Sequence, residues 1–235
     1  MLGLVLAGEI ETVGADVRSF KVGDQVFGFE GLAFGAYAEY KCMAEKGVLT
    51  AKPSNLSYEE AAAIPYGGLL ALQYLNRGGI QSGQRVLIYG ASGAVGTSAV
   101  QLAKHFGATV TGVCSAANLE LVTSLGADAV IDYTKDDFTK DGERYDLVLV
   151  AVGNRFGPPS QAACEKALAP NGKYVAVDQG RPKLIKEELV MLRQLAEAGE
   201  LVPVIDRTYP LHQMVEAHRY VDQGHKKGNV VITVA

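Results

Sequence analysis

Residues 84–107, QRVLIYGASGAVGTSAVQLAKHFG, decide the predicted fold of this 235-residue chain. Residues 85–89 form a short apolar run with β-branched side chains, which predicts a buried parallel strand. Small residues fill positions 90–96, and residues 97–106 then show the spacing of an amphipathic helix. A helix N-terminus offers unpaired N–H groups, and small residues let a pyrophosphate approach them. The stretch therefore predicts a phosphate-binding strand, turn and helix.

The turn ASGAVG, residues 91–96, fits the pattern G-x-G-x-x-G with Ala at the first place. Small residues in such a turn also permit ordinary tight packing of a helix on a strand. The position of the turn, after a strand and before a helix, favours the binding of a dinucleotide. A nucleoside-triphosphate loop of the Walker type is excluded, because no Lys follows Gly96.

The end of the next strand bears on the choice of cofactor. In NAD binders an acidic residue about 20 residues after the glycine turn accepts hydrogen bonds from the ribose. Here the chain reads Cys114 and then SAAN, without an acid. A carboxylate would repel a 2′-phosphate, whereas Ser115 and Asn118 can donate to one. NADPH is therefore favoured over NADH, although this loop contains no Arg or Lys.

From residue 84 onward, strands and helices are expected to alternate. Strands are expected at 85–89, 109–113, 129–132, 146–152 and 173–178, and helices at 97–106, 118–125, 135–139 and 160–168. Such alternation predicts an α/β fold with a Rossmann-type, doubly wound parallel sheet.

The segments on either side of this region follow other patterns. Before it, strands are expected at 8–13, 24–29, 37–43 and 47–51, followed by a helix that Ser57 caps and Pro65 stops and by a second helix at 69–75. After residue 180 the expected elements are helices at 187–199 and 212–221, an extended piece at 203–206 and a strand at 230–234. The first helix of this tail would bury Leu189, Leu192, Leu195 and Ala196.

Composition narrows the classes of partner. The net charge of −4 and the lack of a Lys/Arg-rich block give no general attraction to nucleic acid or anionic membranes. The longest apolar stretch, residues 61–72, is too short to span a bilayer and contains Pro65. Three scattered cysteines argue against a disulfide framework. We expect a cytoplasmic protein that binds a small molecule and neither nucleic acid nor a membrane.

No familiar catalytic pattern emerges from the spacing of reactive residues. Tyr37 and Lys41 match the Tyr-x-x-x-Lys pair of short-chain dehydrogenases, but they precede the glycine turn instead of following it. The four histidines, His105, His212, His218 and His225, show no metal-ligand spacing with one another or with cysteine. No bound metal is therefore expected, and no catalytic residue is assigned on spacing alone.

Several stretches together resemble the medium-chain dehydrogenase/reductase superfamily, on the zinc-free quinone oxidoreductase (zeta-crystallin-like) side. They are AGEIETVG (7–14), FKVGDQVFGF (20–29), GAYAEY (35–40), LSYEEAAAIPYGG (56–68), the glycine turn, SLGADAVIDY (124–133) and HKKGNVVITV (225–234). The resemblance implies a GroES-like substrate domain at 1–70, a Rossmann dinucleotide-binding domain at 71–200 and a C-terminal segment at 201–235 that returns to the first domain.

The resemblance also implies which residues contact the cofactor. They are Ser92, Gly93, Ala94, Val95, Gly96, Ser115, Asn118, Tyr133, Val152, Gly153 and Asn229. For Tyr133 and Asn229, packing and turn formation are the alternatives. Tyr66 is a candidate proton donor, with a packed aromatic at a helix end as the alternative.

The chain also departs from the family. Zinc alcohol dehydrogenases carry G-H-E where this chain has Gly3, Leu4 and Val5, and the cysteine-rich zinc lobe is missing between residues 26 and 35. Where members often have Gly-Leu-Thr-Ala near the nicotinamide, this chain has Leu70 in place of Thr. The start of the GroES-like domain is expected to be incomplete, as is the segment between residues 179 and 186, where members commonly hold a strand that pairs across a dimer.

These observations lead to competing hypotheses of function. The first is an NADPH-dependent reductase of a quinone, an enone or another carbonyl compound, acting by hydride transfer without zinc. The second is a nucleotide-binding remnant of such a reductase, with little or no turnover. A zinc-type alcohol dehydrogenase is the third. An incomplete β domain with exposed edges also leaves association into a homo-oligomer open.

Overall fold

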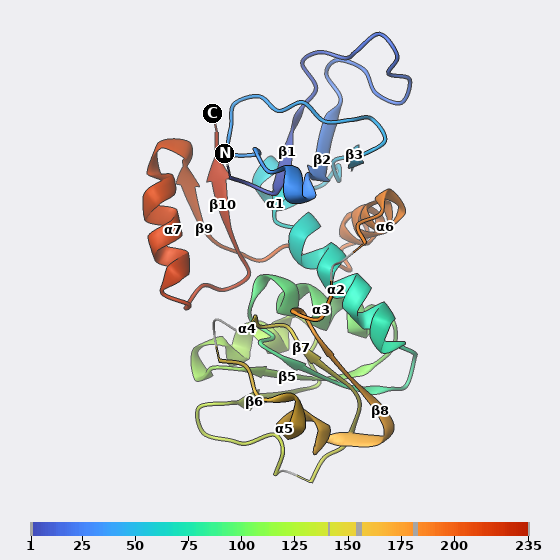
Figure 1. The fold of residues 1–235 in the computed structure, drawn as a ribbon, viewed down its shortest axis with the longest axis vertical. Coiled ribbons are helices and arrows are strands. Elements are labelled where there is room, and N and C mark those ends of the chain that lie inside the picture. The colour runs from blue at the N-terminus through green and yellow to red at the C-terminus, as the bar shows by residue number, and fades with distance from the viewer. Residues whose placement is uncertain (1, 141, 154–156, 181–182, 235) are drawn as a thin grey trace. The chain divides into compact units, whose positions relative to one another are not determined.

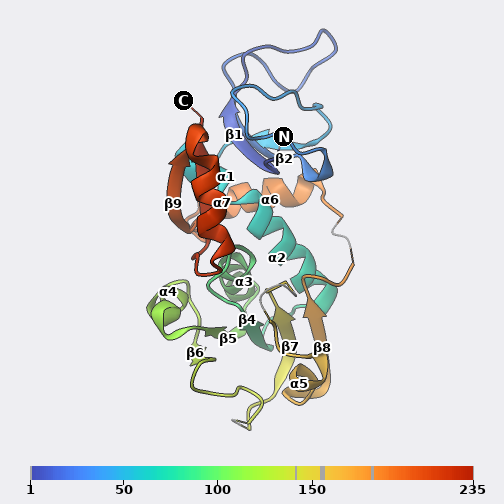
Figure 2. The same ribbon diagram turned by 60° about the vertical axis from the view of Figure 1, so that its left-hand side comes forward.

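The computed structural model describes residues 2–140, 142–153, 157–180 and 183–234. The chain divides into unit 1, which is Met1–Leu69 with Leu184–Ala235, and unit 2, which is Leu70–Lys183. The boundary between them falls within helix α2 (Pro65–Gly78). Each unit has its own sheet structure, as Figure 1 and Figure 2 show.

Unit 2 is built on a five-stranded parallel sheet. Its strands run in the order β6 (Ala129–Asp132), β5 (Thr109–Cys114), β4 (Arg85–Tyr89), β7 (Tyr145–Val150) and β8 (Leu168–Ala176). Strand β4 lies at the centre of the sheet, and its apolar residues Val86, Leu87 and Ile88 are fully buried there. Helix α3 (Ala94–His105) packs on β4 and β5, α4 (Leu119–Ser124) on β5 and β6, and α5 (Gln161–Glu165) on β8. The predicted doubly wound parallel sheet is confirmed.

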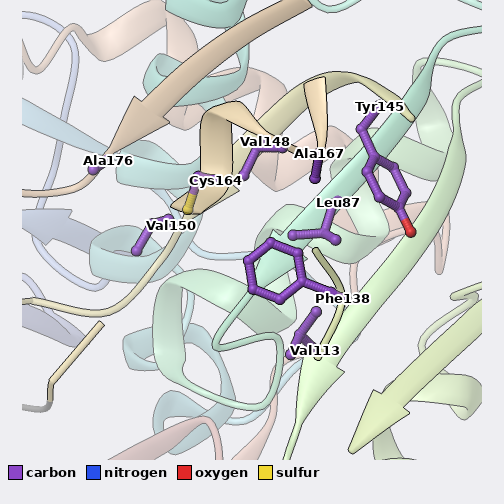
Figure 3. Packing of buried hydrophobic residues seen from close by; sticks show 9 residues of the cluster. All are labelled: Leu87, Val113, Phe138, Tyr145, Val148, Val150, Cys164, Ala167 and Ala176. Atoms are coloured by element: carbon purple, nitrogen blue, oxygen red, sulfur yellow. The ribbon is translucent and has the colours of Figure 1, made fainter. Parts of the chain in front are cut away.

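Nine buried residues form a hydrophobic cluster in unit 2. They are Leu87, Val113, Phe138, Tyr145, Val148, Val150, Cys164, Ala167 and Ala176. Figure 3 shows that the Phe138 ring from the segment after β6 joins strand residues in this cluster, as does the Cys164 sulfur of α5. The cluster thus fixes a non-helical segment and a short helix to the sheet.

The helix expected at 135–139 is wrong, because residues 133–140 form turns. Asp132 Oδ1 accepts hydrogen bonds from the backbone N and Oγ1 of Thr134 at 3.1 and 2.7 Å. Asp137 Oδ1 accepts the same pair of bonds from Thr139, at 3.0 and 2.7 Å. Each aspartate satisfies the backbone two residues later, and such local bonds compete with helix formation.

Strand β8 lies at one edge of the sheet, and its pairing with β7 is interrupted. Leu168 pairs with Tyr145, and the next pair joins Lys173 to Leu147. Four residues of β8 therefore oppose a single residue of β7 between these pairs. Within that bulge Asn171 has a positive φ of 66°, a conformation that Asn tolerates better than most residues.

Unit 1 contains two small sheets. Strands β1 (Val5–Glu9), β2 (Gln25–Phe29) and β3 (Val48–Ala51) pair in antiparallel fashion, and β9 (Ile205–Pro210) pairs in parallel with β10 (Asn229–Thr233). The helices besides the start of α2 are η1 (Gly31–Ala33), α1 (Tyr58–Ala62), α6 (Lys186–Glu197), η4 (Leu211–Gln213) and α7 (Met214–Asp222). The Ser57 cap is confirmed as a capping box with Glu60. Helix α6 buries the four residues that its spacing predicts.

Four expectations for unit 1 need correction. The strand expected at 8–13 is displaced, because β1 covers Val5–Glu9 and residues 10–13 lie outside it. Residues 37–43 form no strand, with bends at 37–39, and Lys41 Nζ donates to Phe34 O at 2.7 Å. Pro65 begins α2 instead of only stopping a helix, since proline suits the first helical position. Helix α6, which the sequence places in the dinucleotide-binding domain, groups with unit 1 in the structure.

Among the helices that the structure describes, none combines the length and apolar character that a membrane span requires.

Candidate cofactor-binding site

The glycine turn of unit 2 is fixed to the neighbouring strand. Gly90 follows β4 with φ at +81°, a conformation that favours glycine. The backbone N–H groups of Gly90 and Ala91 both donate to Val113 O, at 2.9 and 3.0 Å. Gly93 N–H then donates back to Gly90 O at 3.1 Å. The turn is therefore held at the carboxyl ends of β4 and β5, where open α/β sheets bind ligands.

Two glycines of this turn differ in what surrounds them. A β-carbon on Gly96 would lie 2.1 Å from Gly90 O and 2.7 Å from the Ala91 α-carbon, so only glycine fits without a shift. A β-carbon on Gly93 would meet only Gly90 O, at an ordinary 3.5 Å. Gly96 thus serves close packing of helix on strand, while the space beside Gly93 stays open for a ligand.

Helix α3 presents its N-terminus at this turn. Gly93 is the N-cap residue, and no side chain caps the helix. Thr97 N–H donates to Gly93 O at 2.8 Å, which begins the i to i−4 pattern. The N–H groups of Ala94, Val95 and Gly96 precede this bond and lie at the positive end of the helix dipole. This arrangement suits an anionic pyrophosphate.

Three residues predicted to contact the cofactor meet beside the turn. Asn118 Nδ2 donates to Ser92 Oγ and to Ser115 Oγ, both at 3.2 Å. Both amide hydrogens of Asn118 are thereby engaged in this structure, and its contact with the cofactor stays a prediction. The serine hydroxyls accept these bonds, and each keeps its own proton to donate. The hydroxyl hydrogens of Ser92 and Ser115 are therefore the ones that this cluster can offer to a ligand oxygen.

Asn118 keeps one free hydrogen-bonding atom. The residue is 9% exposed, and its Oδ1 is buried without a partner among the described residues. Leaving a buried acceptor unsatisfied costs about 1–3 kcal/mol. A ligand that offers a hydroxyl or amino hydrogen, as a ribose or an adenine does, would satisfy this oxygen.

Sequence reasoning assigned no role to Asp132, the last residue of β6. Its side chain is 5% exposed, and its Oδ2 has no hydrogen-bond partner among the described residues. The bonds from Thr134, the Lys135 charge and the Ala116 N–H lower the pKa of this carboxyl, although burial opposes them. The sequence does not show that Asp132 lies next to the predicted cofactor loop, because this position depends on the pairing of Asp132 with Cys114 in the sheet.

The remaining predicted residues of unit 2 line the same end of the sheet. Tyr133 is 52% exposed, and its ring centroid lies 6.0 Å from that of Tyr89. Val152 packs against the turn, since its Cγ2 would lie 2.4 Å from a β-carbon on Gly90. Among the described residues, a β-carbon on Gly153 would meet nothing within 4 Å. Tyr133 and Gly153 thus leave surface open for a ligand.

Two candidates belong to unit 1. Tyr66 stacks on Phe29 with ring centroids 6.2 Å apart, and burial raises the pKa of its hydroxyl. Asn229 donates through its backbone N and its Nδ2 to Val204 O, at 2.8 and 3.1 Å. These bonds match a turn-forming role for Asn229, and its contact with the cofactor stays a prediction.

A dinucleotide fits the residues of unit 2. The turn offers helix N–H groups for phosphates, hydroxyl donors from two serines and a buried acceptor without a partner. In the described part of the chain, no group of three or more His, Cys, Asp or Glu residues could hold a metal ion.

Comparison with known families gives two matches. Residues 94–214 match the family described as zinc-binding dehydrogenase, and residues 1–54 match the alcohol dehydrogenase GroES-like domain. Together the two matches cover most of the chain, in the same order as the predicted domains.

Curated relatives match almost the full chain. A 2-methylene-furan-3-one reductase of Solanum lycopersicum is 36% identical, and the match covers 98% of this chain and 62% of the relative. An NADPH-dependent alkenal/one oxidoreductase of Arabidopsis thaliana is 32% identical, with 98% and 63% covered. A chloroplast envelope quinone oxidoreductase homolog of the same plant is 35% identical, with 97% and 78% covered. The chain therefore spans less than two thirds of the length of the first two relatives.

Solved structures give a consistent result. The quinone oxidoreductase from Coxiella burnetii matches with a TM-score of 0.85 at 30% identity, over 100% of this chain and 79% of that one. An alcohol dehydrogenase superfamily protein from Novosphingobium aromaticivorans matches with a TM-score of 0.87 at 28% identity, over 100% and 82%.

Proposed function

Because this chain belongs to the medium-chain dehydrogenase/reductase superfamily, we propose that it is an NADPH-dependent oxidoreductase that reduces a quinone, an enone or another small carbonyl compound. The names of its relatives support this chemistry: they include an alkenal/one oxidoreductase that is NADPH-dependent and a quinone oxidoreductase homolog. Within this proposal unit 2 is the dinucleotide-binding domain, and unit 1 contains the GroES-like substrate domain and the C-terminal segment.

The observation that carries the proposal is the cluster of Ser92, Ser115 and Asn118 beside the N-terminus of α3. The N–H groups of Ala94, Val95 and Gly96 would hold the pyrophosphate, with Gly93 leaving room for it. The hydroxyls of Ser92 and Ser115 would donate to the adenosine end. Tyr133 would cover that end, and Val152 and Gly153 would lie under the cofactor.

The bound cofactor would supply the hydride, and the protein would supply binding, orientation and a site that excludes water. We propose that no zinc takes part, because Gly3, Leu4 and Val5 replace the G-H-E segment of zinc alcohol dehydrogenases. Tyr66 is the candidate for proton delivery from unit 1. Burial raises the pKa of its hydroxyl further above neutral, so the group stays protonated but is a weak acid.

A second candidate function is nucleotide binding without turnover. It is favoured by Leu70, a buried residue without a hydroxyl where members of the family often have Thr. The two candidates share the same cofactor site, so cofactor binding does not separate them. Reduction of a substrate does.

The test uses the full chain in two steps. NADPH binding is first measured through cofactor fluorescence, and NADPH oxidation is then followed with a panel of quinones and enones. We expect binding in the micromolar range or tighter, together with oxidation by some of the panel. NADPH binding without oxidation would contradict the reductase function and support nucleotide binding without turnover. Absence of NADPH binding would contradict both candidate functions. Metal analysis of the active protein checks the zinc-free proposal, which stoichiometric zinc would contradict.

A further inference from the structure

The loops after β5 and β6 leave the sheet side by side. Cys114 and Asp132, the last residues of these strands, are paired in register, and Tyr133 N–H donates to Cys114 O at 3.1 Å. The loop after β5 contains Ser115 and Asn118, which the proposed function places at the adenosine end. The loop after β6 therefore emerges next to that end of the site.

Asp132 joins the two loops. Its Oδ1 accepts from the backbone N–H and hydroxyl of Thr134 in its own loop, and the carboxyl also interacts with the Ala116 N–H of the other loop. Its Oδ2 is buried without a hydrogen-bond partner among the described residues. This oxygen forms an ion pair with the ammonium of Lys135, whose Nζ lies 3.8 Å from Oδ2. The buried carboxylate thus draws the Lys135 head group toward the adenosine end.

The Lys135 ammonium remains open to a second anion. The side chain is 72% exposed, and a separation of 3.8 Å is an ion pair without a close hydrogen bond. Because the ammonium is largely exposed, solvent weakens this ion pair. A phosphate monoester carries about −1.5 to −2 charges at neutral pH, more than the single charge of Asp132. An incoming phosphate would therefore compete for the ammonium, although the ionised Asp132 carboxylate opposes its approach.

The local sequence makes Lys135 the natural choice. Residues 115–118, SAAN, contain no cation, and the turn segment 133–140, YTKDDFTK, contains Lys135 and Lys140. Lys140 pairs with Asp137 at 3.0 Å, and that carboxylate is 44% exposed, unlike the buried Asp132. The two lysines thus form similar i, i+3 pairs, but only the Asp132 pair connects to the loop after β5.

We propose that Lys135, positioned by the buried carboxylate of Asp132, binds the 2′-phosphate of NADPH and gives this chain its preference over NADH. The inference rests on the proposed function, because it requires unit 2 to bind an adenine dinucleotide. It supplies from the β6 loop the positive charge that the β5 loop lacks. The serine hydroxyls of the β5 loop would then add hydrogen bonds to the same group.

The test compares Lys135→Gln with the matched variant Lys140→Gln in the full chain. Dissociation constants for NADPH and NADH are measured through cofactor fluorescence, without any substrate. Lys135→Gln should weaken NADPH about tenfold, the order of one charge-assisted hydrogen bond, and change NADH less than about twofold. Lys140→Gln should leave both unchanged, and Lys135→Arg should restore NADPH binding. The wild-type preference should also fall as salt is raised, and this dependence should weaken in Lys135→Gln.

The outcomes separate the inference from the proposed function. If Lys135→Gln weakens both cofactors equally, Lys135 only supports the loop and the inference fails while the proposed function stands. An unchanged NADPH constant in Lys135→Gln leads to the same conclusion, as does a wild-type protein that binds NADH alone. If the wild-type protein binds neither cofactor, the proposed function fails as well.

Discussion

Gly96 lies so close to Gly90 that a β-carbon on Gly96 would stand 2.1 Å from the Gly90 carbonyl oxygen. This approach lets α3 begin directly against the end of β4, and it fixes where the helix N-terminus points. Gly93 lies in the same turn but has room for a side chain. Gly96 is therefore required by the packing of α3 on β4, whereas a glycine at position 93 is not required by packing and leaves space for a ligand.

Gly96→Ala should destabilise the protein by about 1–3 kcal/mol, because the extra methyl overpacks a backbone contact. Gly93→Ala should keep the wild-type melting temperature within a few degrees and yet weaken NADPH binding, because its methyl would enter the space proposed for the pyrophosphate. Thermal unfolding and cofactor fluorescence measure the two effects. A Gly93→Ala variant with full NADPH affinity would show that the phosphates bind elsewhere.

Asn118→Ala should remove the amide that Ser92 and Ser115 share. We expect a loss of about 1 kcal/mol in stability, the net worth of an ordinary hydrogen bond, and an NADPH dissociation constant raised about tenfold because the serines lose their fixed positions. Asn76→Ala is the control, since Asn76 is exposed near the end of α2. If Asn118→Ala and Asn76→Ala bind NADPH equally well, Asn118 does not contribute to the cofactor site.

Asp132 should make stability depend on pH. Its folded pKa is lowered, so its ionised form stabilises the fold above the unfolded value of about 3.9. This stabilisation is lost as the pH falls through the lower folded pKa. Asp132→Asn should therefore be less stable than wild type at pH 7, and the difference should shrink below about pH 4.

Urea unfolding at pH 7 and near pH 3 measures this difference. Asp137→Asn provides a comparison from the same segment, because bonds from Thr139, followed by Lys140, lower the Asp137 pKa to about 2. Its contribution should likewise be present above about pH 4 and fade toward pH 2. A difference for Asp132→Asn that is the same at both pH values would mean that its charge is not what stabilises the loops.

The three cysteines should react very differently with a thiol reagent. Cys42 is exposed, whereas Cys114 and Cys164 are buried, and burial raises the pKa of both buried thiols to about 11. At pH 8 about one in a thousand of such thiols is ionised, and the thiolate is the reactive form. One equivalent should react quickly in the native protein, and Cys42→Ser should abolish it. A second fast equivalent would contradict the burial of the other two.

Much of the fold follows from local patterns in the sequence. The apolar run of β4, the small residues after it and the helix spacing of α3 all act over a few residues, and the Ser57 capping box is equally local. One wrong prediction has its cause in side chains that compete with the backbone. Asp132 and Asp137 turn the chain at 133–140, although helix propensity alone allows a helix there.

The candidate site was predictable in part. Ser92, Ser115 and Asn118 were named from the sequence, and the structure brings them together. The sequence spacing does not reveal that the Asn118 amide donates to both serine hydroxyls, which leaves the hydroxyl hydrogens as the donors that the cluster can offer to a ligand. The positions of Asp132 and Lys135 beside the β5 loop depend on the register between β5 and β6. That register is set by pairing between residues that are distant in the sequence, so local patterns do not predict it. The cofactor contacts themselves, the cytoplasmic location and the state of association stay predictions.

The bulge in β8 has a consequence for the behaviour of the protein at high concentration. A free sheet edge invites strands of other molecules, and proteins protect such edges with bulges, proline and lysine. Pro170, Asn171 and Lys173 place all three devices in or directly after the bulge of β8. We expect that a second copy does not pair with the whole length of β8, because Pro170 lacks an N–H and the bulge displaces its neighbours. We therefore expect the irregular edge to disfavour aggregation through the sheet of unit 2.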